Sequence, residues 1–292
     1  MTKTADTIKF EQITLTAADG YELAATYYHA DSPVIGHLIV AGATGVPRQF
    51  YTRFAKFAAK RGFTTLTLDY RGIGESKPKT LKGFHVDFLD WARLDLAVAV
   101  DAMADETMPL FMVGHSFGGH ALGLLPNHHQ IKGAYFFATG AGWHGWMPRL
   151  ESLKVSLMWN IIYPVLTRWK GYAPFSLLGM GEDLPLGVYE QWRRWCKFPH
   201  YFFDDAMMSH MAESYAEVKT PIVAANATDD YWATPRSRDA FMKGYRNAPV
   251  TLIDLDPKPF QGGIGHMGYF RKKAKPLWED VLDCFNQYIT YN

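Results

Sequence analysis

A serine enclosed by glycines is the residue of this sequence best placed to do chemistry. Residues 114–118 read Gly-His-Ser-Phe-Gly, with an apolar run on either side. This pattern predicts a sharp turn from a strand into a helix, in which a strained backbone lifts the hydroxyl of Ser116 above the sheet. The small residues at 114 and 118 let the strand and the helix approach each other. The pattern therefore predicts that Ser116 is a nucleophile.

A serine nucleophile needs a base to take its proton and a carboxylate to orient that base. In chains with this kind of turn, the acid and the histidine follow the serine in that order. The predicted acid is Asp230, which follows the apolar run 221–227, and the adjacent Asp229 is the alternative. The predicted base is His266, which lies in a glycine-rich segment after the last predicted strand.

Acyl transfer to a serine also needs two N–H groups aimed at the oxyanion that forms on the substrate. The residue after the nucleophile supplies one of them, so the backbone N–H of Phe117 is the first predicted donor. The second comes from a loop after an earlier strand, where Ala43 in Ala-Gly-Ala-Thr-Gly is the candidate. His115 and His120 belong to the serine turn and its helix, and we expect them to pack there.

Short apolar runs alternate with helix-like segments along the chain. The first two runs flank Asp19-Gly20, which predicts a hairpin. Alternating strands and helices predict an α/β fold with a mostly parallel sheet and helices on both faces. The predicted strands cover residues 11–16, 21–28, 36–43, 63–70, 109–116, 132–140, 220–227 and 248–256. The predicted helices cover residues 50–62, 87–104, a segment from 118, and 276–289.

A segment of different composition interrupts this alternation. Residues 141–217 hold six of the nine tryptophans and six of the twelve methionines. They predict a helical cap inserted into a core formed by residues 1–140 and 218–292. Aromatic and methionine side chains would give a cleft beneath the cap an apolar lining. The predicted substrate-binding residues are Trp143, Trp146, Trp159 and Trp232.

Composition argues against several other kinds of protein. With 30 basic and 29 acidic residues the net charge is +1, so no field recruits nucleic acid, and the basic run 271–275 is predicted to be a solvated helix start. Cys196 and Cys284 are isolated, and His128 and His129 do not point at one site, so no metal is predicted. The amino-terminal residues contain no leader and no apolar run could span a membrane, which predicts a cytoplasmic protein.

These motifs occur in the order found in alpha/beta-hydrolases, and the chain resembles that superfamily along nearly its whole length. Residues 69–76, Asp-Tyr-Arg-Gly-Ile-Gly-Glu-Ser, are frequent in capped members, where Asp69 and Arg71 would be structural. The chain is similar to bacterial hydrolases related to serine aminopeptidases and monoacylglycerol lipases. Many members carry His-Gly before the second oxyanion residue, whereas this sequence has Ala41-Gly42.

The resemblance implies a serine hydrolase that needs no cofactor, and the apolar cap favours an ester with a hydrophobic acyl or alcohol part. An acyltransferase would use the same three residues. A ligand-binding protein without activity would typically lack one of them. An aminopeptidase-like amidase would need a carboxylate in the cap to bind the substrate's amino group, and the candidates are Glu182, Asp183, Glu190 and Glu213.

Overall fold

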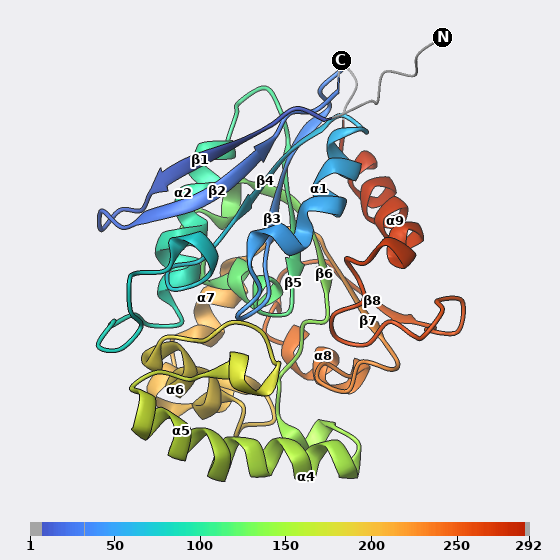
Figure 1. Ribbon diagram of the computed structural model, residues 1–292. Helices are drawn as coiled ribbons and strands as arrows, with labels where there is room; N and C mark the ends of the chain where they lie inside the picture. Colours follow the sequence, from blue (N-terminus) through green and yellow to red (C-terminus); the bar gives the residue numbers. More distant parts are fainter. Residues whose placement is uncertain (1–7, 32, 290–292) are drawn as a thin grey trace.

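The computed structural model describes residues 8–31 and 33–289, which form an eight-stranded sheet with helices on both faces (Figure 1). The strands are β1 (Phe10–Thr16), β2 (Glu22–Tyr28), β3 (Gly36–Ala41), β4 (Phe63–Leu68), β5 (Leu110–His115), β6 (Ile131–Phe137), β7 (Ile222–Ala227) and β8 (Val250–Leu255). Their order in the sheet is β1-β2-β4-β3-β5-β6-β7-β8. The hairpin β1–β2 and the pair β2–β4 are antiparallel, and the other neighbours are parallel. The predicted α/β fold is confirmed.

Nine α-helices occur in the described part of the chain. They are α1 (Thr52–Ala59), α2 (Ala97–Met103), α3 (Phe117–Ala121), α4 (Arg149–Leu157), α5 (Tyr163–Lys170), α6 (Leu186–Trp195), α7 (Met211–Glu217), α8 (Pro235–Met242) and α9 (Lys275–Asn286). The predicted single helix over 87–104 is instead a π-helical turn, Trp91–Leu96, that continues into α2. From this wider turn, the indole N–H of Trp91 donates to the carbonyl oxygen of Arg71. The carboxylate of Asp95 accepts the backbone N–H and the Nε–H of Arg71.

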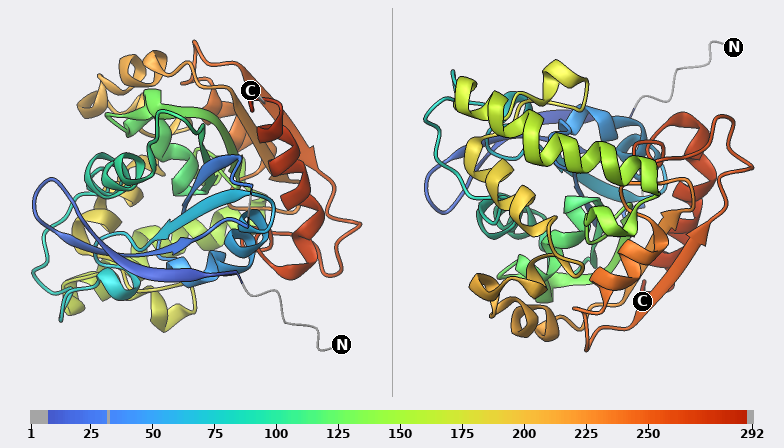
Figure 2. Two further views of the ribbon diagram at one scale, coloured as in Figure 1. Left: turned by 90° about the horizontal axis from the view of Figure 1, so that it is seen from above. Right: turned by 90° about the horizontal axis from the view of Figure 1, so that it is seen from below.

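Alternate residues of the central strands enter two separate apolar layers. In β3, Leu38 and Val40 pack with α1 and α9, whereas Ile39 and Ala41 face the layer that contains α2, α3, α7 and α8. This alternation follows from the two-residue repeat of a strand, and burial on both faces explains why β3 and β5 are mostly apolar. Figure 2 shows α1 and α9 side by side on one face of the sheet.

The chain between β6 and β7 forms a helical layer over the carboxyl ends of the parallel strands (Figure 1). Helices α4, α5 and α6 lie in this layer, while α7 packs on the core near residues 122–124. None of the helices within the described residues is long and apolar enough to cross a membrane. The prediction that the chain has no leader concerns its amino-terminal residues, of which 1–7 lie outside the described part.

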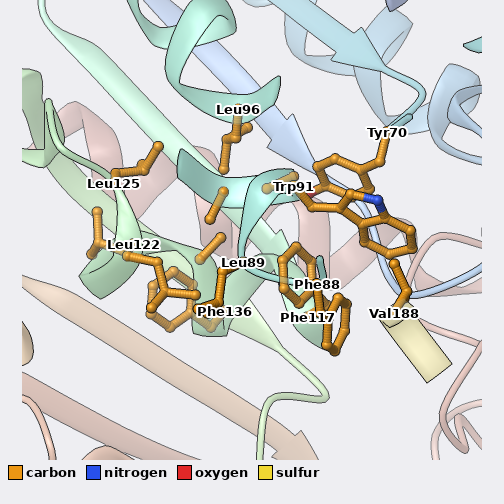
Figure 3. Packing of buried hydrophobic residues seen from close by; sticks show 14 of the residues in the cluster. Tyr70, Phe88, Leu89, Trp91, Leu96, Phe117, Leu122, Leu125, Phe136 and Val188 are labelled. Carbon is orange, nitrogen blue, oxygen red and sulfur yellow. The ribbon is translucent and has the colours of Figure 1, made fainter. Parts of the chain in front are cut away.

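An aromatic cluster anchors the residue that follows Ser116 (Figure 3). The ring of Phe117 stacks on Phe88 with centroids 4.4 Å apart and meets Tyr70 and Trp91 edge-on at 5.4 and 5.5 Å. Such pairs add roughly 1 kcal/mol each beyond the area that they bury. Val188 of α6 reaches the same cluster, so the packing that fixes the serine turn also joins core and cap.

Candidate active site

Ser116 lies at the turn from β5 into α3 with a backbone that L-residues rarely adopt. Its φ is 53° and its ψ is −109°. A Cβ on Gly118 would lie 2.0 Å from the carbonyl oxygen of Ala41, and one on Gly114 would lie 2.6 Å from the nitrogen of Gly119. Both glycines are therefore steric requirements of the turn, as the sequence predicts, and they hold Ser116 in its strained conformation.

Three predicted side chains form one chain of hydrogen bonds. His266 Nε2 lies 3.2 Å from Ser116 Oγ. His266 Nδ1 lies 3.0 and 3.1 Å from the two carboxylate oxygens of Asp230. Since the carboxylate can only accept, it holds the proton of His266 on Nδ1 and leaves Nε2 free to accept the proton of the serine. The structure therefore brings Ser116, His266 and Asp230 together in the geometry of an activated nucleophile.

Asp230 is completely buried and is held as a carboxylate by several donors. Its Oδ1 accepts the N–H groups of Trp232 and Ala233 at 3.1 and 3.0 Å, and its Oδ2 accepts the hydroxyl of Tyr269 at 3.1 Å. Burial alone would raise the pKa of Asp230, but the nearby charge of His266 and these hydrogen bonds keep it below the ordinary value of 3.8. Tyr269 also accepts the N–H of Ala227 at the end of β7, which ties the acid to the sheet.

Asp229, the alternative acid, has a different place in the structure. Its two carboxylate oxygens accept the backbone N–H groups of Ile264 and Gly265 at 2.8 and 3.0 Å. These residues immediately precede His266. Asp229 therefore braces the loop that presents the histidine, while Asp230 contacts the ring. Sequence reasoning missed this bracing role, although the pair of adjacent aspartates was its signal.

The predicted oxyanion donor Ala43 already has a partner. Its N–H donates to the hydroxyl of Tyr51 at 2.8 Å, and Tyr51 in turn lies 2.9 Å from His115 Nδ1. His115 Nε2 lies 2.8 Å from the carbonyl oxygen of His266 and must carry the proton, so Nδ1 accepts from Tyr51. Desolvation, with the nearby His266 as a smaller cause, lowers the pKa of His115 to about 3, which keeps the ring neutral. The structure thus does not leave the N–H of Ala43 free for an oxyanion.

The next residue, Thr44, lines the same cavity as Ser116. Among the residues that the structure describes, neither its N–H nor its hydroxyl has a hydrogen-bond partner. Phe117 opens α3, where the first N–H groups of a helix lack an acceptor within it. Within the described residues, the N–H groups of Thr44 and Phe117 are therefore donors without a partner. The sequence difference at Ala41-Gly42 signalled that this loop departs from the common pattern.

A cavity of about 390 Å³ opens above the serine between core and cap. Trp232 lines it as predicted, but Trp143, Trp146 and Trp159 do not. Trp159 is buried among aromatic residues inside the cap, and the indole N–H of Trp146 donates to Pro199. The lining residues are Ala43, Thr44, Val46, Ser116, Phe175, Gly179, Met180, Gly181, Trp192, Trp232, His266, Met267 and Arg271.

Arg271 is the lining residue with a fixed charge, and no acidic side chain belongs to the lining within the described residues. It begins the basic run that the sequence predicts as a solvated helix start, and α9 begins at Lys275. Glu182 lies close by, but its carboxylate accepts the N–H of Gly74 at 2.8 Å and pairs with Lys77 at 2.9 Å. Asp183 accepts both donors of Ser176.

The motif at 69–76 forms buried ion pairs, as predicted for a structural role. Asp69 accepts the N–H of Arg48 at 2.6 Å and pairs with its guanidinium. Arg71 binds Asp95 and Asp19 at 2.7 and 2.6 Å. No group of three histidine, cysteine or acidic side chains within residues 8–31 and 33–289 is arranged to hold a metal ion.

Comparisons with known proteins agree with this architecture. Residues 38–172 match the family described as serine aminopeptidase, S33. The structure of a soluble variant of monoglyceride lipase from Saccharomyces cerevisiae with a substrate analog is 18% identical, with a TM-score of 0.68 and 99% of each chain covered. The esterase Pf2001 from Pyrococcus furiosus is 14% identical, with a TM-score of 0.60 over 97% of this chain and 94% of that one. No curated protein sequence matches the chain.

A third structure, of DcsB with its substrate analogue, is 16% identical, with a TM-score of 0.65 over 97% of this chain and all of that one. These likenesses extend across the sheet and the cap alike, and the matched family segment contains the strand-to-helix turn at Ser116. The resemblance found in the sequence is confirmed: residues 38–172 match the serine aminopeptidase S33 family, and the chain as a whole has the alpha/beta-hydrolase fold.

Proposed function

We propose that the protein is a serine hydrolase of carboxylic esters with a hydrophobic acyl or alcohol part. The observation that carries this proposal is the continuous chain of hydrogen bonds from Ser116 through His266 to Asp230, at the floor of a cavity between core and cap. The names of structural neighbours, a monoglyceride lipase and an esterase, support chemistry of the same kind.

In the proposed mechanism, His266 Nε2 takes the proton of Ser116 as its oxygen attacks the ester carbonyl. Asp230 keeps the ring oriented and stabilises the imidazolium that forms. The N–H groups of Phe117 and Thr44 hold the oxyanion, in place of the predicted pair with Ala43. His266 then gives its proton to the leaving alcohol, and water releases the acid from the acyl-enzyme by the same steps.

The cavity favours an ester over the free amine of an aminopeptidase substrate. Phe175, Met180 and Trp192 supply apolar surface from the cap, and Arg271 is the charged group at its wall. An ammonium group would need a carboxylate there, but Glu182 and Asp183 are engaged elsewhere. A neutral or anionic ester with a short to medium apolar part fits this lining.

The test is hydrolysis of p-nitrophenyl esters of increasing acyl length by the purified protein and by Ser116→Ala. We expect the substitution to lower kcat by at least about a thousandfold, since the nucleophile and the base act as a unit. Ser209→Ala, at an exposed position, is the matched control and should keep the full rate. Retention of full esterase activity by Ser116→Ala would refute the proposal, and analysis of products with added alcohols separates hydrolysis from acyl transfer.

A further inference from the structure

The outermost helix of the cap carries an apolar stripe that faces solvent. Helix α4, the π-helical turn Met158–Ile162 and α5 form one continuous helix from 149 to 170. Monomeric proteins rarely leave such a row of large apolar side chains uncovered. We call these six residues the outer stripe, and their exposed fractions lie between 48% and 71%: Leu150, Leu153, Leu157, Ile161, Val165 and Trp169.

The π-helical turn keeps the outer stripe in line. In an uninterrupted α-helix of about 100° per residue, Trp169 would be rotated by roughly 100° from Leu150. The turn over Met158–Ile162 has i→i+5 hydrogen bonds and therefore rotates less per residue. It offsets this drift, so the apolar residues on both sides of the turn point the same way.

The opposite side of this helix is apolar as well. Val155, Met158, Trp159 and Tyr163 are buried against the rest of the cap. A helix that is apolar on both sides normally has both sides covered. The inner side is covered by the protein itself, so the outer stripe lacks the partner that its composition requires.

The charges beside the outer stripe indicate what kind of partner fits. Between 149 and 170 the chain has four basic residues, Arg149, Lys154, Arg168 and Lys170, and one acidic residue, which pairs with Lys154. Both ends of the helix are thus positive. Pairing with a second copy would place like charges together in either orientation, which is unfavourable. An anionic surface meets these charges and covers the stripe at once.

We propose that the outer stripe docks the protein on an anionic lipid surface, with the helix lying in the plane of the interface. An amphipathic helix with leucine and tryptophan on one side and flanking lysine and arginine is the kind that binds in this way. Figures 1 and 2 show the helix crossing the outer end of the molecule, away from the sheet. No neighbouring element needs to move to expose it.

Docking there would place the cavity close to the lipid. The segment Phe175–Leu178 follows α5 almost directly, and its Phe175 lines the cavity while Leu177 and Leu178 face solvent. The same segment therefore presents apolar side chains both to solvent and to the substrate space. A substrate with an apolar chain would pass from the lipid to Ser116 along this apolar surface.

The test is cosedimentation with vesicles of phosphatidylcholine alone and of phosphatidylcholine mixed with phosphatidylglycerol. We expect binding to the mixed vesicles, weaker binding to phosphatidylcholine, and loss of binding at high salt. Leu153→Glu should weaken partitioning by about tenfold or more, because a charge replaces apolar surface in the interface. Leu252→Glu on β8 introduces the same charge at another exposed leucine and should bind like the wild-type protein.

Binding is measured in the Ser116→Ala background as well, so that the result does not depend on hydrolysis. Hydrolysis of a short soluble ester by Leu153→Glu should match the wild-type protein, which shows that the variant is folded. Two outcomes would overturn the proposal: equal binding by Leu153→Glu and the wild-type protein, or no vesicle binding at all. A concentration-dependent dimer that Leu153→Glu abolishes would instead assign the stripe to self-association.

Discussion

The hydroxyl of Tyr51 joins two loops that meet at Ser116. It accepts the N–H of Ala43 at 2.8 Å and donates to His115 Nδ1, whose ring in turn donates to the carbonyl oxygen of His266. Ala43, Tyr51 and His115 are buried, so the hydrogen bonds among them replace water that cannot enter. The placement of the loop after β3 and that of the histidine are therefore coupled through one side chain.

We expect Tyr51→Phe to lower the free energy of unfolding by about 2 kcal/mol, since it leaves the N–H of Ala43 and His115 Nδ1 without partners. It should also lower kcat with little change in KM, because the coupled loops act on the transition state. Tyr28→Phe is the matched control, since its buried ring loses a single hydroxyl contact, to Thr52 at 3.1 Å. Urea denaturation and ester hydrolysis measure both effects. Equal behaviour of the two variants would contradict the coupling.

Single residues differ in how far the sequence alone predicts them. Ser116 was predictable because its turn needs glycine on both sides, and His266 because it follows the last strand. The choice between Asp229 and Asp230 was not, since adjacent residues are distinguished only by which way each side chain points. The partner of Ala43 was not predictable either, because Tyr51 reaches it from the turn Arg48–Tyr51, whose place depends on tertiary packing.

At the scale of elements, a cap loop holds the loop after β3. The N–H of Glu182 donates to the carbonyl oxygen of Gly45 at 2.9 Å, and its carboxylate binds Gly74 and Lys77 of the core. A Cβ on Gly181 would lie 2.9 Å from the same carbonyl oxygen of Gly45, so the two loops touch closely. Cap and core are thus fastened beside the cavity.

Glu182→Gln should raise KM for an ester several-fold while changing stability by less than about 1 kcal/mol, because a partly exposed ion pair contributes little to folding. Residues 179–181 line the cavity, and without the anchor at Glu182 they would be less ordered before substrate binds. Asp183→Asn is the control, because Asp183 binds only Ser176 within the cap. Steady-state kinetics and thermal denaturation measure the two quantities. A KM that is unchanged in Glu182→Gln would rule out this role.

The helices and strands of the core were predictable because their apolar repeats match a sheet that is covered on both faces. The composition of the cap predicted a separate segment, but it did not predict which cap residues line the cavity. Trp192 and Met180 reach the cavity, whereas Trp143 and Trp146 do not, and this depends on how short helices pack on one another. No repeat in the sequence indicates such packing, so the sequence does not predict which tryptophans of the cap reach the cavity.

At the scale of the whole molecule, the two buried histidines His115 and His120 make stability depend on pH. Burial lowers the pKa of His115 to about 3 and that of His120 to about 4, from an ordinary value of 6.5. In the unfolded chain both rings take up a proton as the pH falls below 6.5, but in the folded protein they do not. The stability that they contribute is therefore complete above pH 6.5 and is lost as the pH falls toward 4.

As the pH falls through that window, the free energy of unfolding should decrease by up to about 1.4 kcal/mol per pH unit for each of these histidines. Urea denaturation between pH 5 and 7 measures this slope. His120→Asn should remove the contribution of one histidine to this slope, whatever the effect of the substitution on stability at pH 7. His129→Asn, at an exposed position, should keep the slope of the wild-type protein. Parallel curves for His120→Asn and the wild-type protein would contradict the assignment.

The insertion of the cap between β6 and β7 has a consequence for how this protein changes over evolutionary time. Helix α7, the last helix before β7, packs on the core, where the hydroxyl of Tyr215 donates to the carbonyl oxygen of His120. Ser116, Asp230 and His266 all lie outside the inserted residues. A mutation in the cap can therefore alter which molecule enters without changing the groups proposed to break the bond. Glu182 is an exception, because its contacts with Gly74 and Lys77 tie the cap to the core.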